Sequence, residues 1–154
     1  MGLSEEEARK AHSESIGRLF LQAHRDFQAR VMVKLQSGGH EHITPAHLTA
    51  LSQLVGGEIR MVDLAKRMKI TKQSVSDLIH DLEVLGFVER QPDPRDKRAA
   101  ILRFTPAGEA FLIDKLQIAT EIDEEYRVLI GDEGFAQLVD LLKRVVEGGN
   151  RSGE

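Results

Sequence analysis

Two helical patterns joined by a very short turn constrain the fold of this chain more than any other feature. The first pattern covers residues 61–68, and the second runs from Thr71, which can cap a helix, to Gly86, which can end one. The apolar side chains of both patterns recur at three- and four-residue steps: Met61, Leu64, Ala65 and Met68, then Val75, Leu78, Ile79, Leu82 and Leu85. Because a turn of about three residues forces two helices to cross steeply, the sequence predicts a helix-turn-helix.

A charged hairpin is predicted directly after these helices. The stretches GFVERQ and AAILRF are typical of strands, and the segment PDPRDKR lies between them. Pro92 and Pro94 suit a loop better than a paired ladder, so we expect both to mark the turn. An isolated charged turn is usually only a solvated hairpin tip. Behind a helix-turn-helix it completes a winged helix, in which the second helix enters the major groove of DNA. The hairpin then reaches the sugar–phosphate backbone and the adjacent minor groove.

The rest of the chain is predicted to be helical. One long helix is expected from Ser4 to Gln36, and a second begins at Thr44-Pro45, where Thr caps and Pro fits the first turn. After the hairpin, Thr105-Pro106 begins another helix, which Gly131 interrupts. A last helix is expected over residues 132–147, with five apolar side chains buried: Phe135, Leu138, Val139, Leu142 and Val146.

These elements predict a single domain, residues 1–154, of the α+β class that is mainly α with a small β-hairpin. A winged helix-turn-helix lobe at residues 44–104 is flanked by long helices at 4–36 and 105–147. A winged lobe has its own core, so the flanking apolar stripes favour association with a second copy of the chain. Residues 148–154, GGNRSGE, are expected to form a disordered tail.

Composition limits the function. The formal net charge is -4, but residues 60–103 hold ten Lys and Arg against seven Asp and Glu, as expected of a local phosphate-binding surface on an acidic body. The chain has no cysteine, no Gly-rich phosphate loop and no G-x-S-x-G motif, so we do not expect an enzyme. It also lacks an apolar run that could cross a membrane and a signal peptide, so we expect a cytoplasmic protein with no membrane partner.

The stretch from Thr44 to Gly108 resembles the MarR family of winged-helix transcriptional regulators. The matching segments are ITPAHLTALSQL, DLAKRM and ITKQSVSDLIHDLEVLGFVERQPDPRDKRAAILRFTPAGEAF, and the D-x-R-D-x-R wing followed by L-x-F-T-x-x-G is the most specific part. The resemblance implies a homodimer whose first and last helices interlock and which binds a pseudo-palindromic operator in double-stranded DNA. It also implies a repressor that responds to a small-molecule effector, without a bound cofactor.

The predicted DNA-binding residues lie on the second helix and on the hairpin. They are Thr71, Lys72, Gln73, Ser74, Ser76 and His80 on the recognition helix, and Asp93, Arg95, Asp96, Lys97 and Arg98 on the wing. Gln73 suits bidentate contacts to adenine, and Lys72 suits guanine or phosphate. By resemblance, Arg95 matches the wing arginine that reaches into the minor groove, and Asp93 and Arg98 match the pair that braces the wing.

One position departs from the family pattern. Arg60 stands where Ser or Thr usually precedes the first helix of the motif, and its side chain cannot cap that helix. A phosphate contact is the alternative role for this arginine.

Other interpretations remain open beside a DNA-binding repressor. A metal-responsive regulator of the same fold would use His40, His42 and His47, but their spacing follows no zinc pattern, and exposed loop histidines are the simpler interpretation. A winged-helix module that binds protein instead of DNA is compatible with the acidic net charge. A small aromatic acid is the expected effector, bound between the winged lobe and the dimer helices, although no residue set stands out as its ligand-binding site.

Overall fold

The structure is a computed structural model that describes residues 4–6, 9 and 13–151, without the side chains of residues 97, 98 and 149–151. The chain divides into two compact units, one up to Leu116 and one from Gln117 onward. The elements are α2 (Ile16–Ser37), α3 (Pro45–Leu54), β1 (Ile59–Arg60), α4 (Met61–Met68), α5 (Lys72–Val84), β2 (Val88–Asp93), β3 (Asp96–Phe104) and α6 (Pro106–Arg151). Among the described residues, no helix combines the length and apolar character needed to cross a membrane.

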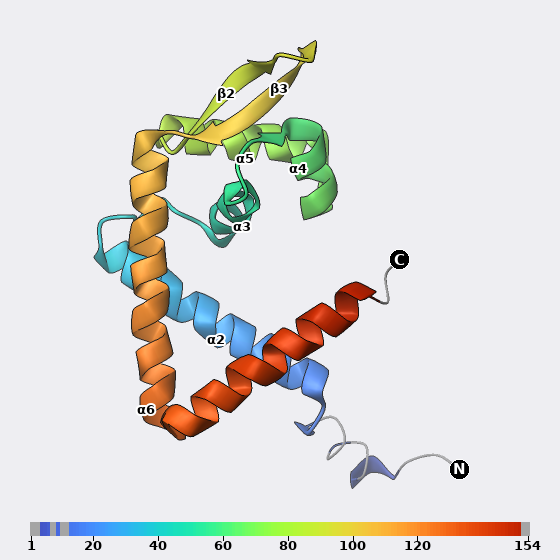
Figure 1. Cartoon of the computed structure of the whole chain (residues 1–154), viewed down its shortest axis with the longest axis vertical. Helices are drawn as coiled ribbons and strands as arrows, with labels where there is room; N and C mark the ends of the chain where they lie inside the picture. Colours follow the sequence, from blue (N-terminus) through green and yellow to red (C-terminus); the bar gives the residue numbers. More distant parts are fainter. Residues whose placement is uncertain (1–3, 7–8, 10–12, 152–154) are drawn as a thin grey trace. The chain divides into compact units, whose positions relative to one another are not determined.

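The first unit contains the winged helix-turn-helix. Helices α3, α4 and α5 contact one another, and an antiparallel sheet of order β1-β3-β2 contacts α4 and α5. Its core is formed by fully buried aliphatic side chains from every layer, among them Leu51, Leu64, Ile79 and Leu102. Strands β2 and β3 project as a hairpin beyond α4 and α5 (Figure 1). The mainly α fold with a small β wing is therefore confirmed.

The sheet differs from the prediction in two ways. Its third strand, β1, pairs Ile59 with Leu102 and Arg60 with Ile101, and the sequence pattern did not indicate it. The expectation that both prolines mark the turn is wrong for Pro92, which lies inside β2 opposite Ala100. Strand β2 is an edge of the sheet, where a residue without an N–H group removes no ladder hydrogen bond.

The first predicted helix is interrupted. Helix α2 begins at Ile16 rather than at Ser4, because the backbone leaves helical geometry at Glu14 and Ser15. Ser15 is extended, with φ -62° and ψ 122°, and the neighbouring Ser13 and Gly17 are also weak helix formers. The helix ends at Ser37, one residue beyond the expected boundary.

Helix α6 is interrupted at the expected residue, but it extends further toward the C-terminus than expected. Gly131 has φ 77° and ψ 159°, outside the helical region, which confirms a break there. The helix then continues to Arg151, so the expectation of a disordered tail from residue 148 is wrong for residues 148–151. Residues 152–154 lie outside the described part of the chain.

The second unit leaves much apolar surface uncovered. Phe135 is buried as expected, and Val139 is half-buried, but three of the side chains expected in a core are exposed: Leu138, Leu142 and Val146. The Arg127 guanidinium lies 4.3 Å from the centre of the Phe135 ring and pairs with Glu124, so it joins the two sides of the Gly131 kink. The exposed leucines and valine follow the helical stripe that the sequence predicted, and the described residues of this unit leave them uncovered.

Candidate nucleic-acid interface

The recognition helix α5 begins at a well-formed cap. The Thr71 side chain accepts a hydrogen bond from the Ser74 backbone N–H at 3.1 Å, which confirms Thr71 as the cap. The helix ends at Val84, and two residues later Gly86 has a φ of 77°, which is unfavourable for other residues. The Phe87 N–H then returns to the Leu82 carbonyl at 3.0 Å. These local signals fix both ends of the element on which the predicted base-reading residues lie.

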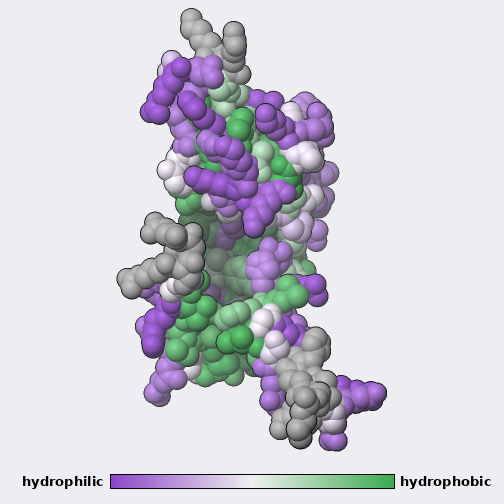
Figure 2. Space-filling view, turned by 90° about the vertical axis from the view of Figure 1, so that its right-hand side faces the viewer, coloured by the Kyte–Doolittle hydropathy of each residue, from purple (hydrophilic) through white to green (hydrophobic). Residues whose placement is uncertain are grey.

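One face of α5 is buried and the other is polar. Val75, Ile79 and Leu82 are fully buried, whereas five of the predicted DNA-binding residues are exposed: Thr71, Lys72, Gln73, Ser74 and His80. Ser76 is only half-buried, and its carbonyl accepts a hydrogen bond from Arg90 of β2 at 3.0 Å. Figure 2 shows mainly hydrophilic residues over the lobe, in the upper half of the view.

The Gln73 side chain already has a partner within α5. Its Nε2 donates to Asp77 Oδ1, one turn further along, at 2.8 Å. The sequence reasoning gave Asp77 no role. The amide nitrogen carries two N–H groups, so Gln73 can keep this contact while its second N–H and its carbonyl face adenine.

The wing is tied to the start of α6 by a close backbone approach. The Thr105 N–H donates to the Phe87 carbonyl at 3.1 Å, and the Thr105 hydroxyl accepts from the Gly108 N–H at 3.0 Å. A Cβ at Gly108 would lie 1.9 Å from the Phe87 oxygen. Glycine is therefore required at this position of the L-x-F-T-x-x-G segment for steric reasons, and the helix begins directly against the base of the wing.

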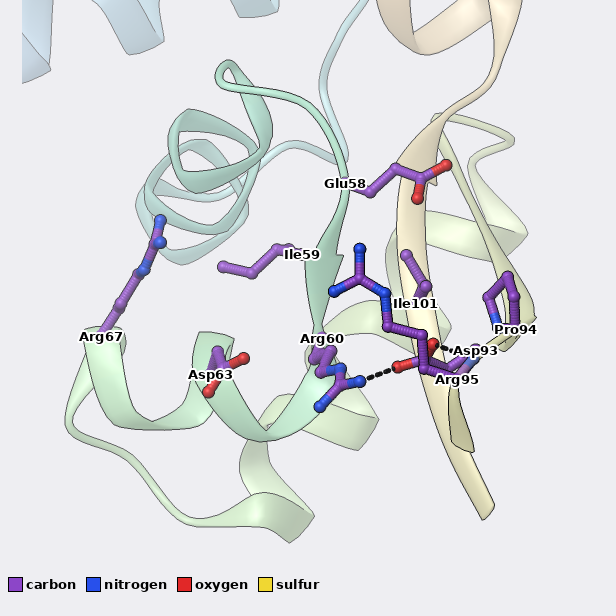
Figure 3. Close-up of a pocket in the computed structure, with 9 residues that line it drawn as sticks. All are labelled: Glu58, Ile59, Arg60, Asp63, Arg67, Asp93, Pro94, Arg95 and Ile101. Atoms are coloured by element: carbon purple, nitrogen blue, oxygen red, sulfur yellow. Dashed lines mark hydrogen bonds and ion pairs between the residues drawn. The ribbon is translucent and has the colours of Figure 1, made fainter. Parts of the chain in front are cut away.

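The wing is braced by a residue that the sequence reasoning did not pair with it. Asp93, whose side chain is 1% exposed, receives the Arg95 backbone N–H on Oδ1 at 2.8 Å, and its Oδ2 lies 2.5 Å from Arg60 Nη2. Both contacts are drawn in Figure 3. The expected partner, Arg98, has a side chain outside the described part of the chain, as does Lys97. Arg60, for which the sequence suggested a phosphate contact, makes this ion pair in the structure.

The contacts of Asp93 favour its charged form. The backbone hydrogen bond from Arg95 contributes most to lowering the pKa of Asp93, burial opposes it, and the positive charge of Arg60 lowers it further. The carboxylate is therefore charged when the wing is folded, and it holds the turn at Pro94 and Arg95 from within.

A cavity of about 330 Å³ separates the wing turn from the start of α4. Charged residues of both signs line it. The basic residues are Arg60, Arg67 and Arg95, and the acidic residues are Glu58, Asp63 and Asp93. In Figure 3 the Arg95 side chain runs from the turn back along the sheet toward Ile59. Arg95 is exposed, so rotation of its side chain is enough to redirect the guanidinium away from the cavity. Asp96 is also exposed at the tip.

The histidines do not converge on a metal site. Within the described residues, no group of three or more metal-ligating side chains comes together. The expectation of an exposed histidine is wrong for His47, which is buried and completes the cap of α3: its Nδ1 accepts from the Thr44 N–H at 3.2 Å. His40 is partly buried, with its ring edge against Phe111, so of these three histidines His42 alone is exposed as expected.

A second cavity of the first unit lies between α2, α3 and the first turns of α6. It has a volume of about 360 Å³. Phe27, Val31 and Leu48 line its apolar side, and His24 and Lys115 are its basic groups. Burial lowers the pKa of Lys115, because an ammonium group loses hydration there.

Comparison with known proteins agrees with this geometry. The MarR family model matches residues 43–99, which include α3, the helix-turn-helix and most of the wing. The winged helix-turn-helix of this chain is therefore similar to that of the MarR family. It is 29% identical over 114 residues to the uncharacterized HTH-type transcriptional regulator YdcH of Bacillus subtilis, covering 73% of this chain and 78% of YdcH.

Solved structures extend the likeness of this chain beyond the lobe. Wild-type MarR from E. coli, in its apo form, superposes with a TM-score of 0.74 at 25% identity, over 84% of this chain and 95% of MarR. A mutant MarR from E. coli complexed with operator DNA gives a TM-score of 0.67 at 24% identity, over 88% of this chain and 96% of that one, and shows that the fold is shared.

Proposed function

We propose that this chain is a DNA-binding transcriptional regulator that binds a pseudo-palindromic operator as a homodimer in the cytoplasm. The observation that carries the proposal is the pairing, in one rigid lobe, of an exposed polar start of α5 with a wing turn that presents Arg95. MarR of E. coli, similar to this chain in sequence and fold, has been solved with operator DNA. The relatives are regulators, and we assign the chain no catalytic activity.

The two elements suit neighbouring grooves. The N-terminal turn of α5 carries Lys72 and Gln73, whose side chains match the acceptors of guanine and the paired donor and acceptor of adenine. Arg95 suits the narrow, negative minor groove of A·T-rich DNA. The contact with Asp77 occupies one N–H of the Gln73 amide and leaves the other N–H and the carbonyl for adenine.

Exposed apolar side chains at both ends of the chain support a homodimer. In α2 they include Ile16, which is 65% exposed, and Phe20. In the second unit they include Val128, which is 89% exposed, with Leu129 and Val146. Exposed apolar surfaces of this kind are costly in water, and a second copy of the same chain covers them with two-fold symmetry. That symmetry matches an operator with two half-sites.

The cavity between α2, α3 and α6 supports a ligand-responsive repressor. A small aromatic acid fits its chemistry, with the ring against Phe27 and Leu48 and the carboxylate near Lys115. The partly desolvated ammonium of Lys115 gains more from an anion than a fully hydrated lysine does. Operator release by phenolic carboxylates, and its loss in Lys115→Met, tests this part of the proposal; a metal-responsive regulator would be stabilised by zinc instead.

The proposal as a whole is tested by selecting genomic fragments with the purified full chain and titrating the best fragment by fluorescence anisotropy. We expect an affinity of roughly 10⁻⁸ M or tighter at physiological salt, and a sedimenting species of two copies. A chain that sediments as one copy, or that retains no DNA even at low salt, contradicts the proposal. The second result favours a protein-binding module instead.

A further inference from the structure

Arg60 joins two elements of the lobe that are distant in sequence. It is the last residue of β1 and the residue before α4, yet its side chain makes no cap to that helix. The guanidinium turns instead to the wing and lies 2.5 Å from Asp93 Oδ2. Arg60 therefore makes this ion pair with the wing in place of a cap to α4.

Asp93 lies where the hairpin is irregular. The register of β2 against β3 shifts between Pro92 and Asp93, so the regular ladder does not fix the turn. One carboxylate oxygen holds the Arg95 backbone and the other faces Arg60. A buried carboxylate that loses the cation paired with it is destabilised, because less of its charge is compensated. Loss of Arg60 therefore removes the ion pair and also releases the turn that Asp93 holds.

We propose that Arg60 is the positioning residue of the wing, which acts through Asp93 to fix the turn that presents Arg95 to DNA. Arg60 is thus not a phosphate ligand, and its effect on DNA binding passes through Arg95. The DNA readout of this inference rests on the proposed function, whereas the contact between Arg60, Asp93 and the Arg95 backbone does not.

A double-mutant cycle on the selected operator fragment separates positioning from direct contact. Arg60→Ser, which restores a capping residue to α4, should weaken binding about tenfold in the wild-type background. In the Arg95→Ala background the same change should weaken binding less than about twofold, because the residue being positioned is gone. Equal losses in both backgrounds would show a direct DNA contact by Arg60 and overturn the proposal.

Arg103→Ser is the matched control. Arg103 also lies on the sheet of this lobe and pairs with Glu58, but it lies at the end of β3 away from the wing turn. We expect the affinity of Arg103→Ser for the operator fragment to stay within about twofold of that of the wild type. A loss as large as that of Arg60→Ser would mean that any ion pair of the lobe has this effect, and would contradict a specific role.

Amide hydrogen exchange of the DNA-free chain gives a second readout. The Arg95 amide, which donates to Asp93, should exchange faster in Arg60→Ser, stay protected in Arg103→Ser and be partly protected in Arg60→Lys. An unchanged exchange rate in Arg60→Ser overturns the proposal. If the wild type binds no DNA, the proposed function fails, while this exchange experiment still decides the role of Arg60.

Discussion

Gly108→Ala is the substitution for which the structure gives the sharpest stability prediction. An alanine Cβ would lie 1.9 Å from the Phe87 carbonyl oxygen, 2.8 Å from its carbonyl carbon and 2.9 Å from the Phe104 ring. Two of these three atoms belong to the backbone, so rotation of a side chain cannot relieve the contact. The start of α6 and the base of the wing must move apart.

The magnitude follows from what that movement breaks. The Thr105 N–H bond to Phe87 and the Gly108 N–H bond to Thr105 each contribute about 1 kcal/mol. Overpacking at a site that cannot relax adds about 1–3 kcal/mol. We expect the free energy of unfolding to fall by about 3–5 kcal/mol, which corresponds to a decrease in Tm of roughly 6–20 °C for a chain of this size.

Thermal unfolding followed by circular dichroism measures this effect. All variants are compared at one protein concentration, because the Tm of a dimer depends on concentration. Gly134→Ala is the matched control: its Cβ would meet only the Ile130 side chain, at 3.6 Å, and the better helix former should leave Tm unchanged or raise it. A Gly108→Ala variant with the same Tm as the wild type would refute the close approach between α6 and the wing.

Four further predictions concern the recognition helix and the wing. Arg95→Ala should lower operator affinity and reduce the slope of log affinity against log salt by about one, measured by anisotropy at several salt concentrations; a parallel titration line at equal affinity would exclude a DNA contact. Gln73→Ala should abolish the preference for adenine among operator variants, and an unchanged ranking of those variants contradicts base reading. Thr71→Ala should lower the free energy of unfolding by about 1 kcal/mol, measured in urea, whereas Thr49→Ala inside α3 should not remove a cap. Because the folded-state pKa of Asp93 is lowered, its contribution is present above about pH 4 and lost as the pH falls further, so Asp93→Asn should flatten the loss of stability in acid; equal acid sensitivity of both proteins would contradict this.

The elements that the sequence predicted correctly are those set by local chemistry. Thr71 and Gly86 delimit α5, and Thr44 and Thr105 precede α3 and α6, because a cap or a left-handed glycine acts within a few residues of itself. The break at Gly131 belongs to the same class. The buried face of α5 followed from the spacing of its apolar residues alone.

The features that were missed depend on contacts between distant residues. Strand β1 is two residues long and exists because it pairs with β3, so no periodicity marks it. The place of Pro92 in a strand depends on which edge of the sheet β2 occupies. The pairing of Arg60 with Asp93 joins β1 to the wing, and the only sequence signal for it was an arginine where a capping residue was expected.

Hydroxyl-radical footprinting of the selected operator by the wild type and by Arg95→Ala tests the central claim most directly. The wild type should protect two half-sites about 10 base pairs apart, with additional protection in the minor groove beside each. Arg95→Ala should keep the half-site pattern and lose the minor-groove protection. A wild type that protects no discrete site, or a variant whose pattern is identical to that of the wild type, would contradict an interface made of α5 and the Arg95 wing.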